Sequence, residues 1–80
     1  MDPARKEHGM TLMEAVLGQE YTIESIVTGD EELEAFLFSL GCYSGETITV
    51  VTKKRSGCVV SIKDARYSID KHLAGVILVK

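Results

Sequence analysis

The side chains best suited to metal chemistry in this chain are two cysteines and two histidines. They are Cys42, Cys58, His8 and His72, all of residue types that bind Zn²⁺ or Fe(II). Structural zinc sites usually draw on closely spaced pairs such as Cys-x-x-Cys, and no such pair occurs here. Cys58 alternates with Val60 and Ile62, which favours a buried position. These observations make metal binding the alternative function and not the first one. In this alternative the chain is a metal-sensing or metallochaperone domain that binds Fe(II) or another transition metal through Cys42, Cys58 or His72.

Nucleophilic catalysis requires a thiol or hydroxyl held against a base that a third group orients. Cys42 and His72 are the one candidate pair, and nothing in the sequence brings them together. The acidic residues Glu31, Glu32 and Glu34 lie at the start of a predicted helix, where negative charge complements the helix dipole. The sequence has no glycine-rich phosphate loop of the G-x-x-x-x-G-K-[ST] or G-x-G-x-x-G type. These features predict a protein that is not an enzyme.

A basic group, Lys53, Lys54 and Arg55, lies at the tip of a predicted hairpin, near Lys63 on the same hairpin, and is a candidate contact for an acidic partner. Loops on rigid scaffolds often carry binding, although charges at a loop tip also keep a sheet edge soluble. Tyr43, in the loop after the predicted helix, is a second candidate contact. Nine Lys and Arg stand against twelve Asp and Glu, a net charge of −3. Nonspecific nucleic-acid binding needs an excess of basic residues, so we expect no nucleic-acid partner.

The length of the chain, 80 residues, predicts one small domain with a thin core. Residues 1–10 mix both charge signs with Pro3 and Gly9, which predicts a disordered tail before a folded domain of residues 11–80. No apolar run approaches the roughly 20 residues that span a bilayer, so direct membrane insertion is not expected. Two cysteines and a polar N-terminal segment predict reduced thiols in the cytoplasm.

The clearest element that must position these side chains is a helix over residues 30–40. Asp30 can cap its first turn, and Gly41 supplies the left-handed position that ends it. Four apolar side chains recur at the spacing of one helix face, namely Leu33, Phe36, Leu37 and Leu40. We expect this face to pack against the core, with Phe38 off the stripe.

Five short strands are expected around this helix. Alternating apolar residues place them at residues 20–27, 46–53, 58–62, 66–69 and 76–79. An irregularity is expected near Ser25, and residues 54–57 form a hairpin turn. Single helical turns are expected at residues 12–16, where Thr11 and Glu14 can form a capping box, and at residues 71–74 after a cap at Asp70. The order predicts a mainly β fold with one α-helix, bent into a small barrel.

An ordered set of segments also matches a known family. They are Thr11-Leu12, residues 17–23 (LGQEYTI), the helix ending at Leu40-Gly41, Gly45, Ile48-Thr49-Val50, the Gly57 hairpin and residues 69–79 (IDKHLAGVILV). In this order they resemble the FeoA family, small cytoplasmic proteins that accompany bacterial ferrous-iron transport. Two positions depart from the family pattern: Ser56-Gly57-Cys58 replaces a Gly-Gly-Pro-like hairpin, and Asp70 stands where a basic residue is common.

The resemblance implies an SH3-like β-barrel and a non-catalytic accessory protein. Its implied partner is the cytoplasmic GTP-binding portion of a membrane ferrous-iron transporter of the FeoB type. The family is similar in fold to the C-terminal domain of diphtheria-toxin-repressor-type metalloregulators, but the helix-turn-helix that would bind DNA is missing from this sequence. No resident cofactor is expected by default, with Fe(II) or another transition metal as the alternative. Self-association through an exposed strand edge, giving a homo-oligomer, is a further expectation.

Overall fold

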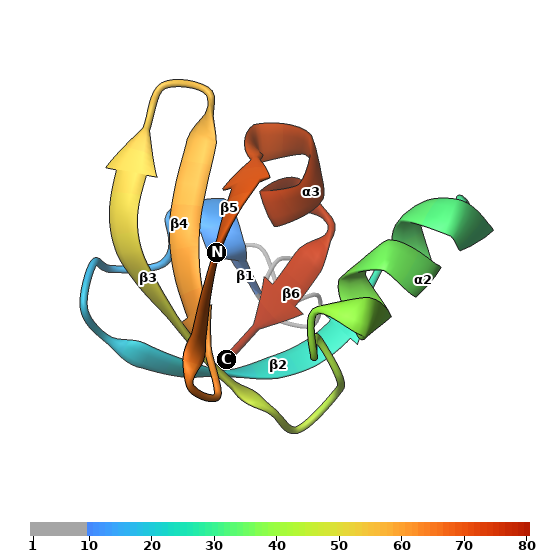
Figure 1. Ribbon diagram of the computed structural model, residues 1–80, viewed down its shortest axis with the longest axis horizontal. Helices are drawn as coiled ribbons and strands as arrows, with labels where there is room; N and C mark the ends of the chain where they lie inside the picture. The colour runs from blue at the N-terminus through green and yellow to red at the C-terminus, as the bar shows by residue number, and fades with distance from the viewer. Residues whose placement is uncertain (1–9) are drawn as a thin grey trace, which may run out of the picture.

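The computed structural model describes residues 10–80, which form six strands and three helical segments. In chain order these are β1 (Met10–Thr11), the 3₁₀ turn η1 (Leu12–Glu14), β2 (Glu20–Ile26), α2 (Glu31–Ser39), β3 (Thr47–Lys54), β4 (Gly57–Ile62), β5 (Ala65–Asp70), α3 (Lys71–Gly75) and β6 (Ile77–Val79). The strands are antiparallel in the order β1-β6-β2-β3-β4-β5. They form a strongly bent sheet with a barrel-like shape (Figure 1), as the sequence predicts.

The structure has one strand more than the five expected from the sequence. Met10 pairs with Val79 and Thr11 with Leu78, so β1 extends the sheet beyond β6. Two residues are too few to show a period-2 pattern, which is why the sequence did not reveal this strand. Met10 thus lies in the sheet, and residues 1–9 of the predicted tail lie outside the described residues.

Strand faces and irregularities agree with the predicted alternation. Ile48 and Val50 are both fully buried on one face of β3. The register between β3 and β4 shifts between Val50 and Thr52, which bends the sheet. A second shift, between Ile23 and the predicted position Ser25, occurs where β2 passes along β6. These two irregularities allow a single sheet to curl around its own core.

The predicted packing of the helix is confirmed for Leu37 and for Leu40, which is partly buried against the core, and it is wrong for Phe36. Asp30 caps α2 as expected, because its Oδ1 accepts hydrogen bonds from the backbone N–H groups of Glu32 and Leu33 at 3.0 and 3.2 Å. Of the four stripe residues, however, Leu37 alone is fully buried, and Phe36 keeps 49% of its surface exposed. The helix lies beside the barrel, with its C-terminal end nearest to the strands, and projects away from them (Figure 1).

Side chains from the strands, short turns and loops fill most of the core, which explains why α2 contributes only Leu37 to it. The buried residues are Leu12, Ala15, Tyr21, Ile23, Leu37, Cys42, Ile48, Val50, Cys58, Val60, Ile62, Ile69, Ala74, Ile77 and Val79. Two of these, Leu12 and Ala74, come from η1 and α3, which contact each other. Both of these turns begin as predicted: Glu14 Oε1 accepts from the N–H of Thr11, and Asp70 Oδ1 accepts from the N–H of Leu73, each at 2.8 Å.

Candidate functional site

An aromatic pair at the C-terminal end of α2 is the most developed surface feature. The ring centroids of Phe38 and Tyr43 lie 5.7 Å apart with an interplanar angle of 39°, a favourable geometry for aromatic contact. The Nζ of Lys63 lies 5.9 Å from the centroid of the Tyr43 ring, within the range of a cation–π interaction. Phe38 and Tyr43 nevertheless remain 40% and 46% exposed. We call these three residues the aromatic cluster.

The loop that carries Tyr43 is held rigidly by its neighbours. Gly41 ends the helix with φ +97°, and a Cβ at this position would lie 3.3 Å from Cγ2 of Ile62, at the end of β4. The next residue, Cys42, is buried in the core, which fixes the start of the loop. Farther on, Ser44 donates through its hydroxyl to the carbonyl of Glu24 at 2.9 Å. Tyr43 is therefore presented on an anchored backbone, beside the turn that carries Lys63.

Lys63 occupies an unusual backbone conformation. Its φ of +57° is the one positive value at a residue other than glycine within residues 10–80. Such a conformation costs a lysine free energy that a glycine would not lose. It occurs in the two-residue turn between β4 and β5, next to the aromatic pair. The sequence groups Lys63 with the basic residues of the hairpin tip, but the fold places it at the other end of β4, beside Tyr43.

The two sides of α2 that flank its contact with the barrel have different neighbours. Neighbouring helix residues are rotated by about 100°, so Phe36 and Phe38 flank the buried Leu37 on opposite sides. Phe38 contacts Tyr43, whereas Phe36 is 49% exposed on the other flank. The aromatic cluster is thus built on one side of α2, and Phe36 offers a natural control for it.

The basic group predicted from the sequence lies at the opposite end of β4 from Tyr43. Lys53 and Lys54 end β3, and Arg55 lies in the following turn. Lys53 is not a free contact, since its Nζ donates to the carbonyl oxygen of Met13 at 3.0 Å. This hydrogen bond ties the hairpin to η1. Lys54 and Arg55 are exposed at the tip, so the structure does not join the basic group and Tyr43 into one surface.

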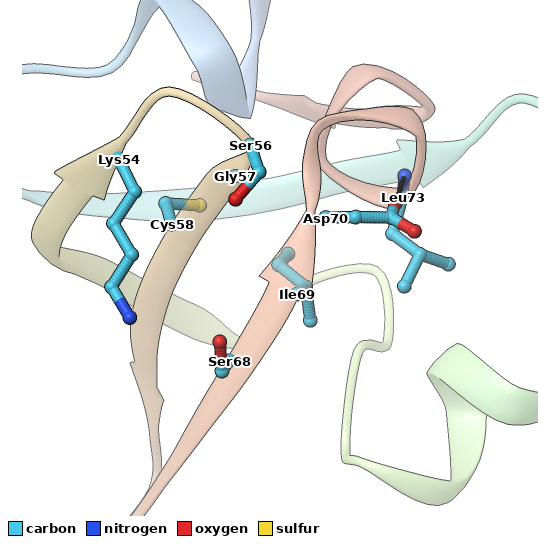
Figure 2. A pocket seen from close by; sticks show the side chains of 8 residues that line it. All are labelled: Lys54, Ser56, Gly57, Cys58, Ser68, Ile69, Asp70 and Leu73. Carbon is cyan, nitrogen blue, oxygen red and sulfur yellow. Dashed lines mark hydrogen bonds between the residues drawn. The ribbon is translucent and has the colours of Figure 1, made fainter.

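A shallow pocket of about 360 Å³ lies below this hairpin tip. Its lining residues come from β3, β4, β5, α3 and the hairpin turn (Figure 2), and they are Lys54, Ser56, Gly57, Cys58, Ser68, Ile69, Asp70 and Leu73. The carboxylate of Asp70 already caps α3. Gly57 is required here because a Cβ would meet the carbonyl oxygen of Ile69, so β4 and β5 approach closely at this point.

Burial keeps the two cysteines protonated. It raises the pKa of the Cys42 thiol from 9.0 to about 11. Burial also raises the pKa of Cys58, an effect that the positive charge of Lys53 opposes. The thiolate is the nucleophile and the metal ligand, so both side chains resemble small core residues at neutral pH.

The structure does not bring the predicted metal ligands together. Cys42 lies near Ile62 at the end of β4, whereas Cys58 lies at its start. His72 is exposed on α3, and His8 lies outside the described residues. Within residues 10–80, no group of three or more His, Cys, Asp or Glu side chains could hold a metal ion.

The bent antiparallel sheet with α3 leading into its last strand defines an SH3-like barrel. Residues 10–80 match the FeoA domain, and the chain belongs to the FeoA family. A crystal structure of an iron uptake regulatory protein, FeoA, is 29% identical with a TM-score of 0.81, over 89% of this chain and 95% of that one. The zinc complex of FeoA from Stenotrophomonas maltophilia, described as a prokaryotic SH3 domain protein, is 23% identical with a TM-score of 0.79, over 90% of this chain and 91% of that one.

A third solved structure, iron(II) transport protein A from Clostridium thermocellum, is 28% identical with a TM-score of 0.79. The match covers 89% of this chain and 44% of that one. No curated protein matches the chain. The family is associated with ferrous-iron transport, and its members are accessory proteins rather than enzymes. In the part of the chain that the structure describes, no helix has the length and apolar character needed to cross a membrane.

Proposed function

We propose that this protein is a cytoplasmic, non-catalytic accessory protein of ferrous-iron transport that binds the cytoplasmic GTP-binding portion of a FeoB-type transporter. The match of residues 10–80 to the FeoA domain carries the proposal. Two features of the described residues support the non-catalytic part. Burial raises the pKa of both thiols, which disfavours a cysteine nucleophile, and the pocket at the hairpin tip is shallow and shares Asp70 with a helix cap.

The aromatic cluster is the surface that we assign to docking. Aromatic residues dominate the energetics of many interfaces because they bury a large area with few rotatable bonds. Phe38, on α2, already contacts Tyr43, on its anchored loop, so little conformational entropy is lost when a partner covers them. Lys63 adds a positive charge over the Tyr43 ring. The complementary partner surface is an apolar pocket with a carboxylate at its rim.

A rigid barrel can change its partner only by binding one of the partner's states more tightly than another. For a GTP-binding partner, the natural states are the GTP-bound and GDP-bound forms. The proposal therefore predicts different affinities for the two forms. Equal affinities would leave the protein an assembly factor without a regulatory effect on nucleotide state.

The test is isothermal titration calorimetry of the full chain against the purified cytoplasmic portion of the transporter, loaded with either nucleotide. Truncation of an interface anchor typically costs more than about 1 kcal/mol, so we expect Phe38→Ala and Tyr43→Ala each to weaken binding about tenfold. Phe36→Ala, on the other flank of α2, is the matched control and leaves affinity unchanged. Absence of binding by the unaltered chain would refute the proposed partner, and equal losses in Phe36→Ala and Phe38→Ala would refute the assigned surface.

Two further measurements on the same pair of proteins address the other sequence-based expectations. In stopped-flow kinetics, charge reversal at Lys54 and Arg55 is expected to slow association, because exposed charges act mainly on the on-rate. Binding with and without Fe(II), repeated with Cys42→Ala and Cys58→Ala, separates docking from metal sensing. Binding that is independent of Fe(II) and of both thiols favours docking. Binding that requires Fe(II) and a cysteine favours the metal-sensing alternative.

A further inference from the structure

The strand β5 (Ala65–Asp70) has one open edge. It is the last strand of the sheet, and in the described chain it pairs with β4 alone. The six pairs from Gly57–Asp70 to Ile62–Ala65 run without a register shift. An edge strand with unpaired N–H and C=O groups is a template for another strand, and proteins usually protect such edges with charged side chains, proline, a bulge or a covering element. β5 contains neither proline nor bulge, and its two exposed charged side chains, Arg66 and Asp70, have opposite signs, so they can attract a second copy of the strand.

The geometry of the preceding turn defines which backbone groups face the open edge. Residues 63–64 form a two-residue hairpin turn, in which the flanking Ile62 and Ala65 exchange both backbone hydrogen bonds. The N–H and C=O groups of successive residues in a strand point alternately to its two sides. The backbone groups of every second residue after Ala65 therefore point toward β4. The N–H and C=O groups of Arg66 and Ser68 and the N–H of Asp70 therefore point to the open edge, whereas the C=O of Asp70, the N-cap residue, accepts the first hydrogen bond of α3. The side chains of these three residues are exposed.

We propose that this edge pairs with β5 of a second copy of the chain, antiparallel and centred on Ser68. In this register Ser68 lies opposite Ser68 of the second copy, and Arg66 lies opposite Asp70 of the second copy, with the reverse pair completing a twofold-symmetric contact. The Ser68 pair exchanges two hydrogen bonds, and in each Arg66–Asp70 pair the N–H of Asp70 donates to the C=O of Arg66. Such a contact is isologous and closes after two copies.

Charge selects this register over the alternatives. Opposite charges directly across an antiparallel pair stabilise it, and like charges destabilise it. A parallel arrangement in the matching register would place Arg66 against Arg66 and Asp70 against Asp70. An antiparallel register centred on Tyr67 would place Arg66 against Ser68 and leave Asp70 without a charged neighbour in the strand. The antiparallel register centred on Ser68 is the one in which both charges of β5 are matched.

Neighbouring contacts are compatible with this pairing. The Oδ1 of Asp70 accepts the N–H of Leu73, and an ionised carboxylate has two oxygens with several acceptor sites. Asp70 can therefore cap α3 and accept from Arg66 of the second copy at the same time. On the core-facing side of β5, Tyr67 would lie directly opposite Ile69 of the second copy. Tyr67 is half-buried against the core and would become more buried in the pair.

The first test is sedimentation equilibrium of the full chain at concentrations up to about 1 mM. We expect the average mass to rise from 8.8 kDa toward twice this value. Arg66→Asp places like charges opposite each other and should keep the mass at 8.8 kDa, whereas Arg55→Asp, the same charge change at the hairpin tip, should behave as the unaltered chain. A chain that stays monomeric at the highest concentration, or an equal effect of both variants, would overturn the proposal.

A second test addresses the strand edge without altering charge. Ser68→Pro removes an N–H that faces the open edge and leaves pairing with β4 intact, so the variant should fold and stay monomeric. Circular dichroism confirms the fold. In hydrogen exchange of the unaltered chain, the N–H groups of Ser68 and Asp70 should gain protection with rising concentration, while that of Tyr67, bonded to β4, should not change. Self-association of Ser68→Pro at the unaltered level would refute pairing through β5.

Discussion

Leu37 is the one fully buried side chain of α2, and its truncation measures how the helix is held to the barrel. Leu37→Ala removes a side chain with 0% exposure. Truncation of a leucine in a rigid core costs about 2.7–5 kcal/mol, depending on how far the cavity collapses. A domain of this size has a total unfolding free energy of about 4–12 kcal/mol. We therefore expect Leu37→Ala to remove a large share of the stability, with a fall in Tm of more than about 10 °C.

Phe36→Ala is the matched comparison on the same helix. Phe36 is 49% exposed, and full burial of such a side chain contributes about 1.5–3 kcal/mol, so its loss should cost about 1 kcal/mol. Urea unfolding followed by circular dichroism gives both free energies, with unchanged m values as the sign of an intact two-state transition. Equal destabilisation by the two variants would show that both flanks of α2 are packed, and it would refute the conclusion that Phe36 faces solvent.

Three further predictions concern stability. Gly57→Ala is expected to destabilise the fold by about 1–3 kcal/mol, because the added Cβ would lie within 2.7 Å of Cα of Asp70. Urea unfolding measures this loss, and an unchanged midpoint would contradict the close approach of β4 and β5. Burial raises the pKa of Cys42 from 9.0 to about 11, so the unfolded chain loses this proton first and stability should fall between about pH 9 and 11. Cys42→Ala should show a smaller fall over that range in Tm measurements, and an identical pH profile would refute the burial argument. Asp30→Ala removes the acceptor of two N–H groups of α2 and should cost about 1 kcal/mol in thermal unfolding; a gain in Tm would refute the capping role.

The capped elements were the most predictable part of the fold, because their signals are local. Asp30, Gly41 and Asp70 all act where the sequence places them. The alternation of β3 likewise identified its buried face. Local signals did not show the environment of α2, since an apolar stripe has the same spacing whether it packs against a core or beside one. In this chain the strands and turns fill the core, and only Leu37 joins it.

Some surface features could be predicted from the sequence and others could not, because the second kind depends on segments that meet only in the folded chain. Tyr43 is an aromatic residue in a predicted loop, which is enough to indicate a contact candidate. The sequence does not place Lys63 beside Tyr43, because its position over that ring depends on the loop and the β4–β5 turn meeting in space. Lys53 shows the opposite case. Its sequence context indicates a free charge at a hairpin tip, but its Nζ bonds the carbonyl of Met13, a residue 40 positions away.

The position of α2 links the fold to the proposed docking. The described core is built mainly from side chains of the strands, η1 and α3, and α2 adds Leu37, so the exposed flanks of α2 contribute little to it. Phe38 can therefore be devoted to contact with Tyr43 and with a partner. The open edge of β5 uses other residues, Arg66, Ser68 and Asp70, so pairing there leaves both aromatic rings in place. A dimer paired through β5 would carry two aromatic clusters, and a partner that presents two matching pockets would bind it more tightly than one cluster allows, because the second contact is intramolecular.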